Sequence, residues 1–246
     1  VSDLLTDEQS VTNLEFAQQY ALEAIEIFTN TVKERLILVE SYIELGCIYR
    51  EMVRRNKNDK AIINVFVDRS VSAFEAAVKN AKAEFTYLSV EAFVNEAWLY
   101  YFVENLENAQ KMVDQALQIV DTRYFFTAER SPLLADDLIP WFWVQIGKAY
   151  LLLGKINFDK YELEIRQNNL YEVEKLLKET AHYWTLSLAY NERYGKSFRD
   201  SSTGRREIYN CLGKLNSQEI SWVKEGILIA RQDYHDAPEL RMFEYF

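Results

Sequence analysis

The fold is decided by one stretch, EAFVNEAWLYYFVENLENAQKMVDQALQIV, which runs from Glu91 to Val120. Large and small side chains recur at helical spacing in each half: Phe93, Ala97 and Tyr100 in the first, and Ala109, Val113 and Ala116 in the second. Small residues let two helix backbones approach closely, while large neighbours fill the remaining space. Between the halves, the segment 105–108 (NLEN) supplies a turn. The stretch therefore predicts two packed helices that bury one face and need a neighbour for the other.

The composition favours helices and argues against several other classes of protein. The chain has 246 residues, of which 49% are hydrophobic, and this is enough for a sizeable core. Seven Gly and three Pro are too few for the many tight turns of a β-sandwich or barrel. A nucleic-acid-binding protein needs basic surfaces to neutralise phosphates, so the net charge of −10 argues against that role.

The chain carries no sign of secretion or of a membrane span. Cys47 and Cys211 are far apart in the sequence, and two cysteines do not imply a disulfide framework. The most apolar run, 138–154, contains Pro140 and Lys148 and is too short and polar to cross a bilayer. We therefore expect a cytoplasmic protein without membrane association. Because the chain begins with Val1, we also consider that it is a piece of a longer protein.

Capping residues, polar breaks and apolar periodicity predict a series of helices. They are expected at about 6–28, 32–55, 60–83, 91–104, 108–120, 140–154, 171–194, 205–216 and 217–233. Thr6 with Gln9 is expected to cap the first, Gly195 to end the helix at 171–194, and Asn216 with Glu219 to cap the last. Four other segments are expected: a longer connector at 124–138, an irregular and partly helical insertion at 155–169, a loop at 196–204 and a tail at 235–246. The whole chain, 1–246, is interpreted as one domain.

One motif recurs on the first helix of successive pairs: an aromatic residue, a large apolar residue followed by Gly, and a second aromatic residue. Two clean copies are Tyr42-x2-Leu45-Gly46-x2-Tyr49 and Trp143-x2-Ile146-Gly147-x2-Tyr150. The copy at Ala97 has Glu96 at the apolar position, and the copy at Gly213 ends in Asn216. Matching motifs on second helices are Ser70/Phe74/Ala77, Ala109/Val113/Ala116 and Thr180/Trp184/Ser187.

These motifs resemble those of the tetratricopeptide repeat superfamily. The resemblance implies an all-α fold of stacked antiparallel helical pairs, with about 8–10 helices in a right-handed superhelix. The anchor positions 46, 97, 147 and 213 lie farther apart than the roughly 34 residues of the usual repeat, so the helices or connections must be longer.

The resemblance also implies a concave groove that the first helices line. Spacing from the anchor positions assigns to this groove Ile43, Cys47, Arg50, Val94, Trp98, Tyr101, Phe102, Val144, Lys148, Leu151, Asn210 and Lys214. The aromatic residues at 98, 101 and 102 exceed what stacking needs, because Phe93, Ala97 and Tyr100 already serve it. Exposed aromatic anchors suit a bound protein segment. Alternatively, neighbouring helices or the tail cover these rings.

Two functions remain open. The first is a scaffold that binds a protein or peptide in the groove, within a larger regulatory or signalling protein. The second is a sensory domain that binds a small ligand in an apolar pocket near Trp98 and Trp143. The first helical pair has Ile43 and Cys47 where members of the family that clamp a terminal carboxylate have Lys and Asn, so that specificity is not expected. The basic loop 196–206 (KSFRDSSTGRR) is a docking or phosphorylation site, or simply a loop.

No catalytic constellation is complete. Glu179-x2-His182 is half of a di-iron motif without its second half, and Gly195-Lys196-Ser197 lacks the other glycine and the strand of a phosphate-binding loop. Asp136-Asp137 is interpreted as the start of a helix. We expect no enzyme activity, no metal and no cofactor, and the sequence leaves the oligomeric state open.

Overall fold

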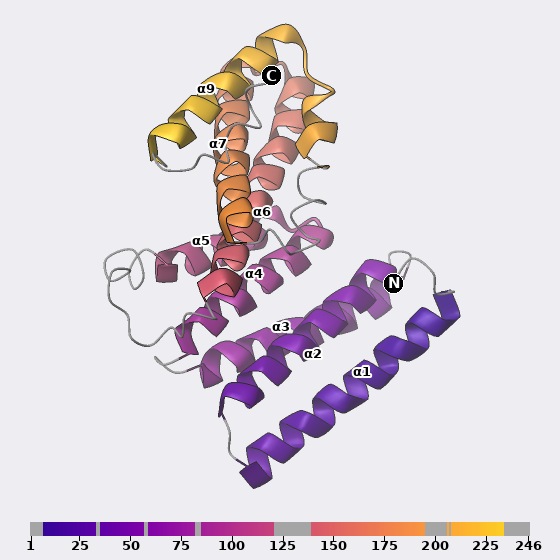
Figure 1. Ribbon diagram of the computed structural model, residues 1–246. Coiled ribbons are helices and arrows are strands. Elements are labelled where there is room, and N and C mark those ends of the chain that lie inside the picture. Colours follow the sequence, from indigo (N-terminus) through magenta and orange to yellow (C-terminus); the bar gives the residue numbers. More distant parts are fainter. Residues whose placement is uncertain are drawn as a thin grey trace. The chain divides into compact units, whose positions relative to one another are not determined.

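The computed structural model describes residues 7–32, 35–56, 59–81, 85–120, 139–194, 206 and 208–233 (Figure 1). Contacts between residues divide the chain into two compact units, Val1–Phe125 and Phe126–Phe246, which we call the first and second units. That the whole chain, 1–246, forms one domain stays a prediction. All named elements are helical, which confirms the all-α class.

The first unit is a run of helices that pack mostly on their neighbours in sequence. Its elements are α1 (Asp7–Ile27), the π-helix η2 (Phe28–Val32), α2 (Arg35–Arg55), α3 (Lys60–Asn80), α4 (Thr86–Phe102) and α5 (Leu106–Val120). Contacts join α1 to α2, α2 to α3, α3 to α4 and α4 to α5. In addition, α2 contacts α4, so the first helices of two successive pairs lie against each other.

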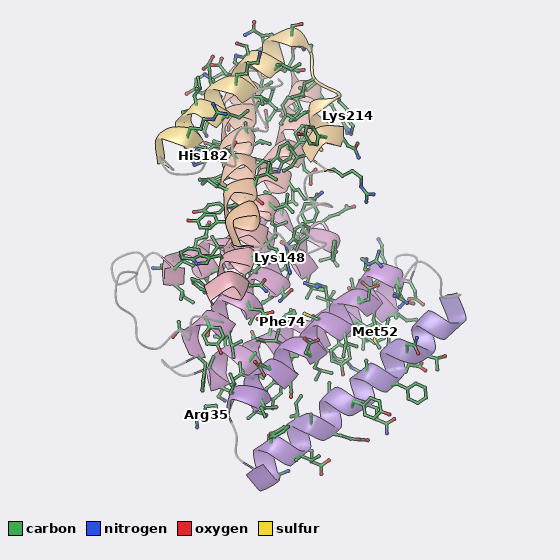
Figure 2. All side chains as sticks on the ribbon, in the orientation of Figure 1. Arg35, Met52, Phe74, Lys148, His182 and Lys214 are labelled. Atoms are coloured by element: carbon green, nitrogen blue, oxygen red, sulfur yellow. The ribbon has the colours of Figure 1, made fainter. Side chains whose placement is uncertain are left out.

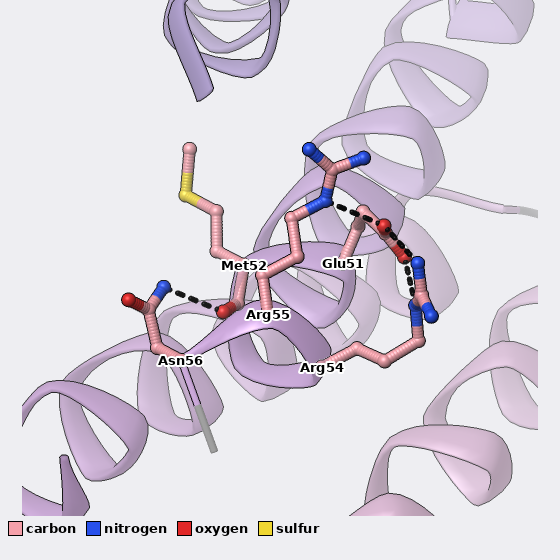
Figure 3. A network of polar contacts seen from close by, with 5 residues as sticks. All are labelled: Glu51, Met52, Arg54, Arg55 and Asn56. Atoms are coloured by element: carbon pink, nitrogen blue, oxygen red, sulfur yellow. Dashed lines mark hydrogen bonds and ion pairs between the residues drawn. The ribbon is translucent and has the colours of Figure 1, made fainter. Parts of the chain in front are cut away.

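Polar side chains fix the ends of these helices. The Asp59 carboxylate accepts hydrogen bonds from the backbone N–H groups of Ala61 and Ile62 at 3.0 and 3.1 Å, and caps α3. At the end of α2, Arg54 and Arg55 both bind the Glu51 carboxylate (Figure 3). Cations in the last turn also complement the partial negative charge of a helix C-terminus.

The hairpin of α4 and α5 and the hairpin of α6 (Ile139–Gln167) and α7 (Leu170–Tyr194) turn in the same way. Glu104 and Asn168 have φ of 60° and 61°, in the left-handed region, and each is followed by Asn. The next amide, of Asn105 or Asn169, donates to a carbonyl five residues earlier, at 2.9 or 3.3 Å. This is the Schellman arrangement, which satisfies the last carbonyls of the first helix and reverses the chain within two residues.

Gly46 is where α2 and α3 approach most closely. A Cβ atom at this position would lie 2.4 Å from the ring of Phe74, so no larger residue fits without displacement. The Ser70 hydroxyl donates to the Gly46 carbonyl oxygen at 2.8 Å. Ser70, Phe74 and Ala77 are all fully buried, and Figure 2 labels Phe74 within this unit. The predicted contact face of α3 is therefore confirmed.

The second unit is built on a long helical hairpin. Its elements are α6 (Ile139–Gln167), α7 (Leu170–Tyr194) and α9 (Ser217–Asp233), and residues 208–212 are also helical. α7 packs against both α6 and α9. The Ser187 hydroxyl donates to the Gly147 carbonyl oxygen at 2.7 Å, which repeats the serine–glycine bond of the first unit.

The expected end of a helix near Gly154 is not observed, because α6 continues to Gln167. Gly154 is a contact point and not a stop: a Cβ there would lie 2.2 Å from the Trp184 indole. The segment 155–169, expected to be irregular and only partly helical, is continuously helical up to Gln167 because Ile156, Phe158 and Tyr161 bury one face of it.

A capping box begins α9, as the sequence predicts. The Asn216 side chain accepts from the backbone N–H of Glu219 at 3.0 Å, and the Glu219 carboxylate accepts from that of Asn216 at 2.7 Å. Other predictions lie outside the described residues: the Thr6 cap, the 124–138 connector with Asp136-Asp137, the Gly195 cap, the 196–204 loop and the 235–246 tail.

Candidate functional site

Three aromatic side chains gather at the end of α4. The Trp98 ring lies 5.7 Å from that of Tyr101 and 5.9 Å from that of Phe102, measured between centroids. The Tyr101 and Phe102 rings are 6.5 Å apart. Trp98 and Tyr101 are half-buried, and Phe102 is 38% exposed. We call these three residues the aromatic cluster; the sequence places all of them in the groove.

A polar contact joins α2 to the helix that carries this cluster. Arg50 Nη1 donates to Asn95 Oδ1 at 2.6 Å and to the Asn95 carbonyl oxygen at 3.5 Å. Trp98 follows Asn95 by three residues and therefore lies on nearly the same face of α4. Cys47, one turn before Arg50, is half-buried. The faces of α2 and α4 that carry these residues adjoin.

Two of the predicted groove residues of the first unit lie in its core. Ile43 is 3% exposed and Val94 is completely buried. Their side chains hold the helices together and present no surface. Within the first unit, the accessible part of the predicted site is therefore Cys47, Arg50 and the aromatic cluster.

The remaining predicted residues belong to the second unit. Val144 is buried and Leu151 is 9% exposed, whereas Lys148 is half-buried (Figure 2). Asn210 and Lys214 are exposed, and Lys214 Nζ lies 3.9 Å from a Glu162 carboxylate oxygen. Because the units are described separately, the groove as a whole stays a prediction.

Glu96 is an unusual residue in the interior of the first unit. It is 4% exposed, and it stands where the repeat motif has an apolar residue. Burial and the nearby charge of Glu75 raise its pKa to about 7, against a hydrogen bond from Tyr100 and the charge of Lys111. The sequence shows that Glu96 departs from the motif, but it does not show that this residue is buried among other charges.

The second unit contains a cleft of about 270 Å³ that sequence reasoning did not anticipate. It lies where α6 turns into α7, beside the start of α9. Its lining is Ile165, Asn168, Leu170, Val173, Asn216, Gln218, Glu219 and Trp222. The Tyr161 hydroxyl donates to Glu219 at 2.8 Å, and burial and this bond raise the Tyr161 pKa. The lining residues therefore offer a ligand both apolar side chains and amide and carboxylate groups.

The residues considered for catalysis take part in local contacts. Glu179 accepts a hydrogen bond from Asn157 at 3.1 Å, and the His182 ring lies 5.5 Å from that of Tyr183. Within the described ranges, no three His, Cys, Asp or Glu side chains are grouped to hold a metal ion. Nor does any helix in that part of the chain have the length and apolarity needed to cross a bilayer.

No protein-family model, no curated protein and no solved structure matches this chain. The resemblance to tetratricopeptide repeats therefore rests on the motifs themselves. What the structure supports is an all-helical protein in which successive helices pack antiparallel, mostly as adjacent pairs.

Proposed function

We propose that the chain is a protein–protein interaction scaffold that binds a segment of a partner on the adjoining faces of α2 and α4. We further propose that its helical pairs are degenerate tetratricopeptide-like repeats stacked in a right-handed superhelix, within a regulatory or signalling protein. The observation that carries the binding proposal is the aromatic cluster, three rings in mutual contact that remain partly open to solvent.

Exposed aromatic groups of this kind are typical anchors of protein interfaces. Trp and Tyr are enriched among residues that dominate binding energy, because they bury a large area at little cost in side-chain entropy. Leaving such rings in water is unfavourable by roughly 25 cal/mol for each Å² of apolar area that a partner would cover. A partner segment with apolar side chains of matching size is therefore the expected ligand.

Arg50 gives the site a cation beside the rings. Both of its hydrogen bonds to Asn95 use Nη1. A guanidinium group has five N–H donors, so Arg50 can hold α2 to α4 and also receive an acidic group. We infer that the preferred segment combines an apolar anchor with a carboxylate.

The test compares three forms of the purified chain in pull-downs from its native lysate: the parent, the Trp98→Ala/Tyr101→Ala double variant, and Tyr171→Ala. Tyr171 is 79% exposed on α7, outside the proposed site, and serves as the matched control. Circular dichroism first establishes that each form is folded. A partner held by the parent and the control but lost by the double variant supports the proposal, whereas equal retention by all three contradicts it.

The cleft in the second unit favours a second candidate function, the binding of a small ligand by a sensory domain. Its lining combines apolar side chains with a few amide and carboxylate groups, as in many ligand sites. Its volume of about 270 Å³ is at the small end of their range. It is not the pocket near Trp98 and Trp143 that the sequence predicts. The Trp143 ring lies 5.6 Å from the ring of Phe142 and 5.4 Å from that of Tyr190, and the pocket near Trp98 and Trp143 stays a prediction.

Thermal stabilisation by a set of metabolites tests this second candidate, because a ligand that binds the folded state raises the melting temperature. Ile165→Trp would fill the cleft from its edge. Leu163→Trp is the matched control, since Leu163 is similarly exposed (49% against 44%) but does not line the cleft. A compound that stabilises the parent and the control but not Ile165→Trp supports ligand binding. If no compound stabilises the parent, or if Ile165→Trp responds equally, the candidate fails.

A further inference from the structure

Glu96 occupies the centre of the helix packing in the first unit. Its helix, α4, contacts α2, α3 and α5, and the neighbouring residues Asn95 and Ala97 are also buried. At 4% exposure, water reaches the carboxyl group very little. An isolated charge in such a place is costly, since the lost hydration must be replaced by protein groups.

The groups around Glu96 compensate this charge only in part. From α3, the Glu75 carboxylate opposes ionisation; from α5, Lys111 favours it; and on α4 itself, Tyr100 hydrogen-bonds to Glu96. Tyr100 is in turn under the influence of a further carboxylate, Asp68 of α3.

On α2, which also contacts α4, the Arg50 guanidinium is hydrogen-bonded to Asn95. Burial and Glu75 together outweigh Tyr100 and Lys111, so the pKa of Glu96 is raised to about 7. The carboxyl group therefore changes its charge within the range of pH that proteins commonly meet.

We propose that Glu96 is a protonation-sensitive latch in the core of the first unit: its neutral form is compatible with the packing of α4 against α3 and α5, and its ionised form loosens that contact. The physical reason is that the charged carboxylate cannot be hydrated and remain in the packed core at the same time. The carboxylate gains hydration by leaving the core, but it can reach water only if α4 separates from its neighbours. This inference does not depend on what the aromatic cluster binds.

The expected size of the effect follows from linkage between protonation and opening. If opening restores the ordinary pKa of about 4.5, the equilibrium for opening increases roughly tenfold between pH 6 and pH 8. Below pH 4.5 the carboxyl is neutral in both states and the effect disappears. Local opening of this kind is measured by hydrogen exchange of backbone amides.

The experiment measures the protection factors of the α4 amides at pH 6 and pH 8, after correction for intrinsic exchange, and titrates the Glu96 carboxyl carbon by NMR. The parent should lose about tenfold in protection over this interval. Glu96→Gln should abolish the loss, and Glu75→Gln should shift the titration to lower pH. Glu107→Gln, which removes an exposed carboxylate at the start of α5, should behave as the parent.

Two results would overturn the proposal. One is a Glu96 titration at the ordinary value of glutamate, and the other is an unchanged loss of protection in Glu96→Gln. If Glu96→Gln does not fold, the parent and Glu75→Gln still decide the question: a latch requires the pH at which α4 loses protection to move together with the Glu96 titration, and a loss that does not follow the titration overturns the proposal.

Discussion

The Ser70 hydroxyl donates a hydrogen bond to the Gly46 carbonyl oxygen at 2.8 Å, across the contact between α2 and α3. Ser187 makes the same bond to Gly147 in the other unit, at 2.7 Å. In both places a glycine of the first helix brings the backbones close enough for a short side chain to bridge them. The bond between a serine and a glycine carbonyl therefore recurs in both units.

Removing these hydroxyl groups should weaken each unit by a similar amount. Ser70→Ala and Ser187→Ala each delete a buried hydrogen bond without leaving a donor unpaired, and we expect losses of about 1 kcal/mol. Urea unfolding of the single and double variants measures this. Losses near zero for both would show that the bond is incidental to the close approach.

Gly46→Ala should be clearly more harmful than an exposed glycine substitution. The added Cβ would lie 2.4 Å from the Phe74 ring, which is fully buried. We expect a cost of about 1–3 kcal/mol from overpacking. Gly213→Ala is the matched control, because the nearest atom there is 3.4 Å away. Addition of Phe74→Leu should restore part of the loss, and strict additivity would argue against a direct clash.

Glu104→Gly should stabilise the first unit. Glu104 holds φ at 60°, which costs most side chains roughly 1 kcal/mol and glycine almost nothing. Part of this gain is offset by the greater freedom of glycine in the unfolded chain. Asn168→Gly should gain less, because Asn tolerates this conformation better than Glu. Thermal melting of both variants gives the order, and a lower stability of Glu104→Gly would contradict the assigned turn.

The same substitution, Glu to Gln, should have opposite effects at positions 51 and 96. Burial disfavours the charge of Glu51, but hydrogen bonds and charges of Arg54 and Arg55 outweigh it and lower the pKa. Its contribution is therefore present above the ordinary pKa near 4.5 and lost as the pH falls through the lowered value. For these surface pairs we expect Glu51→Gln to cost under about 1 kcal/mol at neutral pH.

The pKa of Glu96 is shifted in the opposite direction to that of Glu51. Because its folded pKa is raised to about 7, the folded state holds the extra proton between about pH 4.5 and 7, and stability falls as the pH rises through this window. Above pH 7 the penalty is complete, and Glu96→Gln should raise the free energy of unfolding by up to about 3 kcal/mol. Near pH 4.5 the variant and the parent should agree. Urea unfolding across this range checks both variants, and a Glu96→Gln that is destabilised at pH 8 would refute the assignment.

The sequence predicts the helix contacts well where a small residue marks them. Gly46, Phe74 and Ser70 were identifiable from spacing because close packing of two helices demands a small residue opposite a large one. The α9 capping box was also identifiable, because Asn216 and Glu219 have the spacing of reciprocal caps.

The sequence predicts the ends of helices less well. Gly154 was interpreted as a stop because glycine is a common C-terminal cap, but in this protein it admits the Trp184 ring. The pairs Glu104-Asn105 and Asn168-Asn169, each followed by Leu, mark the true turns, and this recurrence was available in the sequence. Whether a glycine ends a helix or admits a neighbouring side chain depends on tertiary contacts. The spacing of residues within one helix does not specify those contacts.

The candidate site shows the same limit. Trp98, Tyr101 and Phe102 were singled out because they exceed what helix packing requires, and they do lie together. Ile43 and Val94 satisfy the same spacing rule but lie in the core, since a rule based on one helix does not specify which neighbour covers it. The cleft beside Trp222 is lined by residues from three helices, so no single stretch of sequence predicts it.

The most direct measurement of the central claim is site-specific photocrosslinking in the native cell. A photoreactive phenylalanine replaces Phe102, which is 38% exposed within the aromatic cluster, and, as a control, Tyr171, which is 79% exposed on α7. The account predicts a discrete crosslinked protein from position 102 that is absent from position 171 and is lost when Trp98→Ala is added. No adduct at 102, or the same adduct from both positions, would contradict binding at the aromatic cluster.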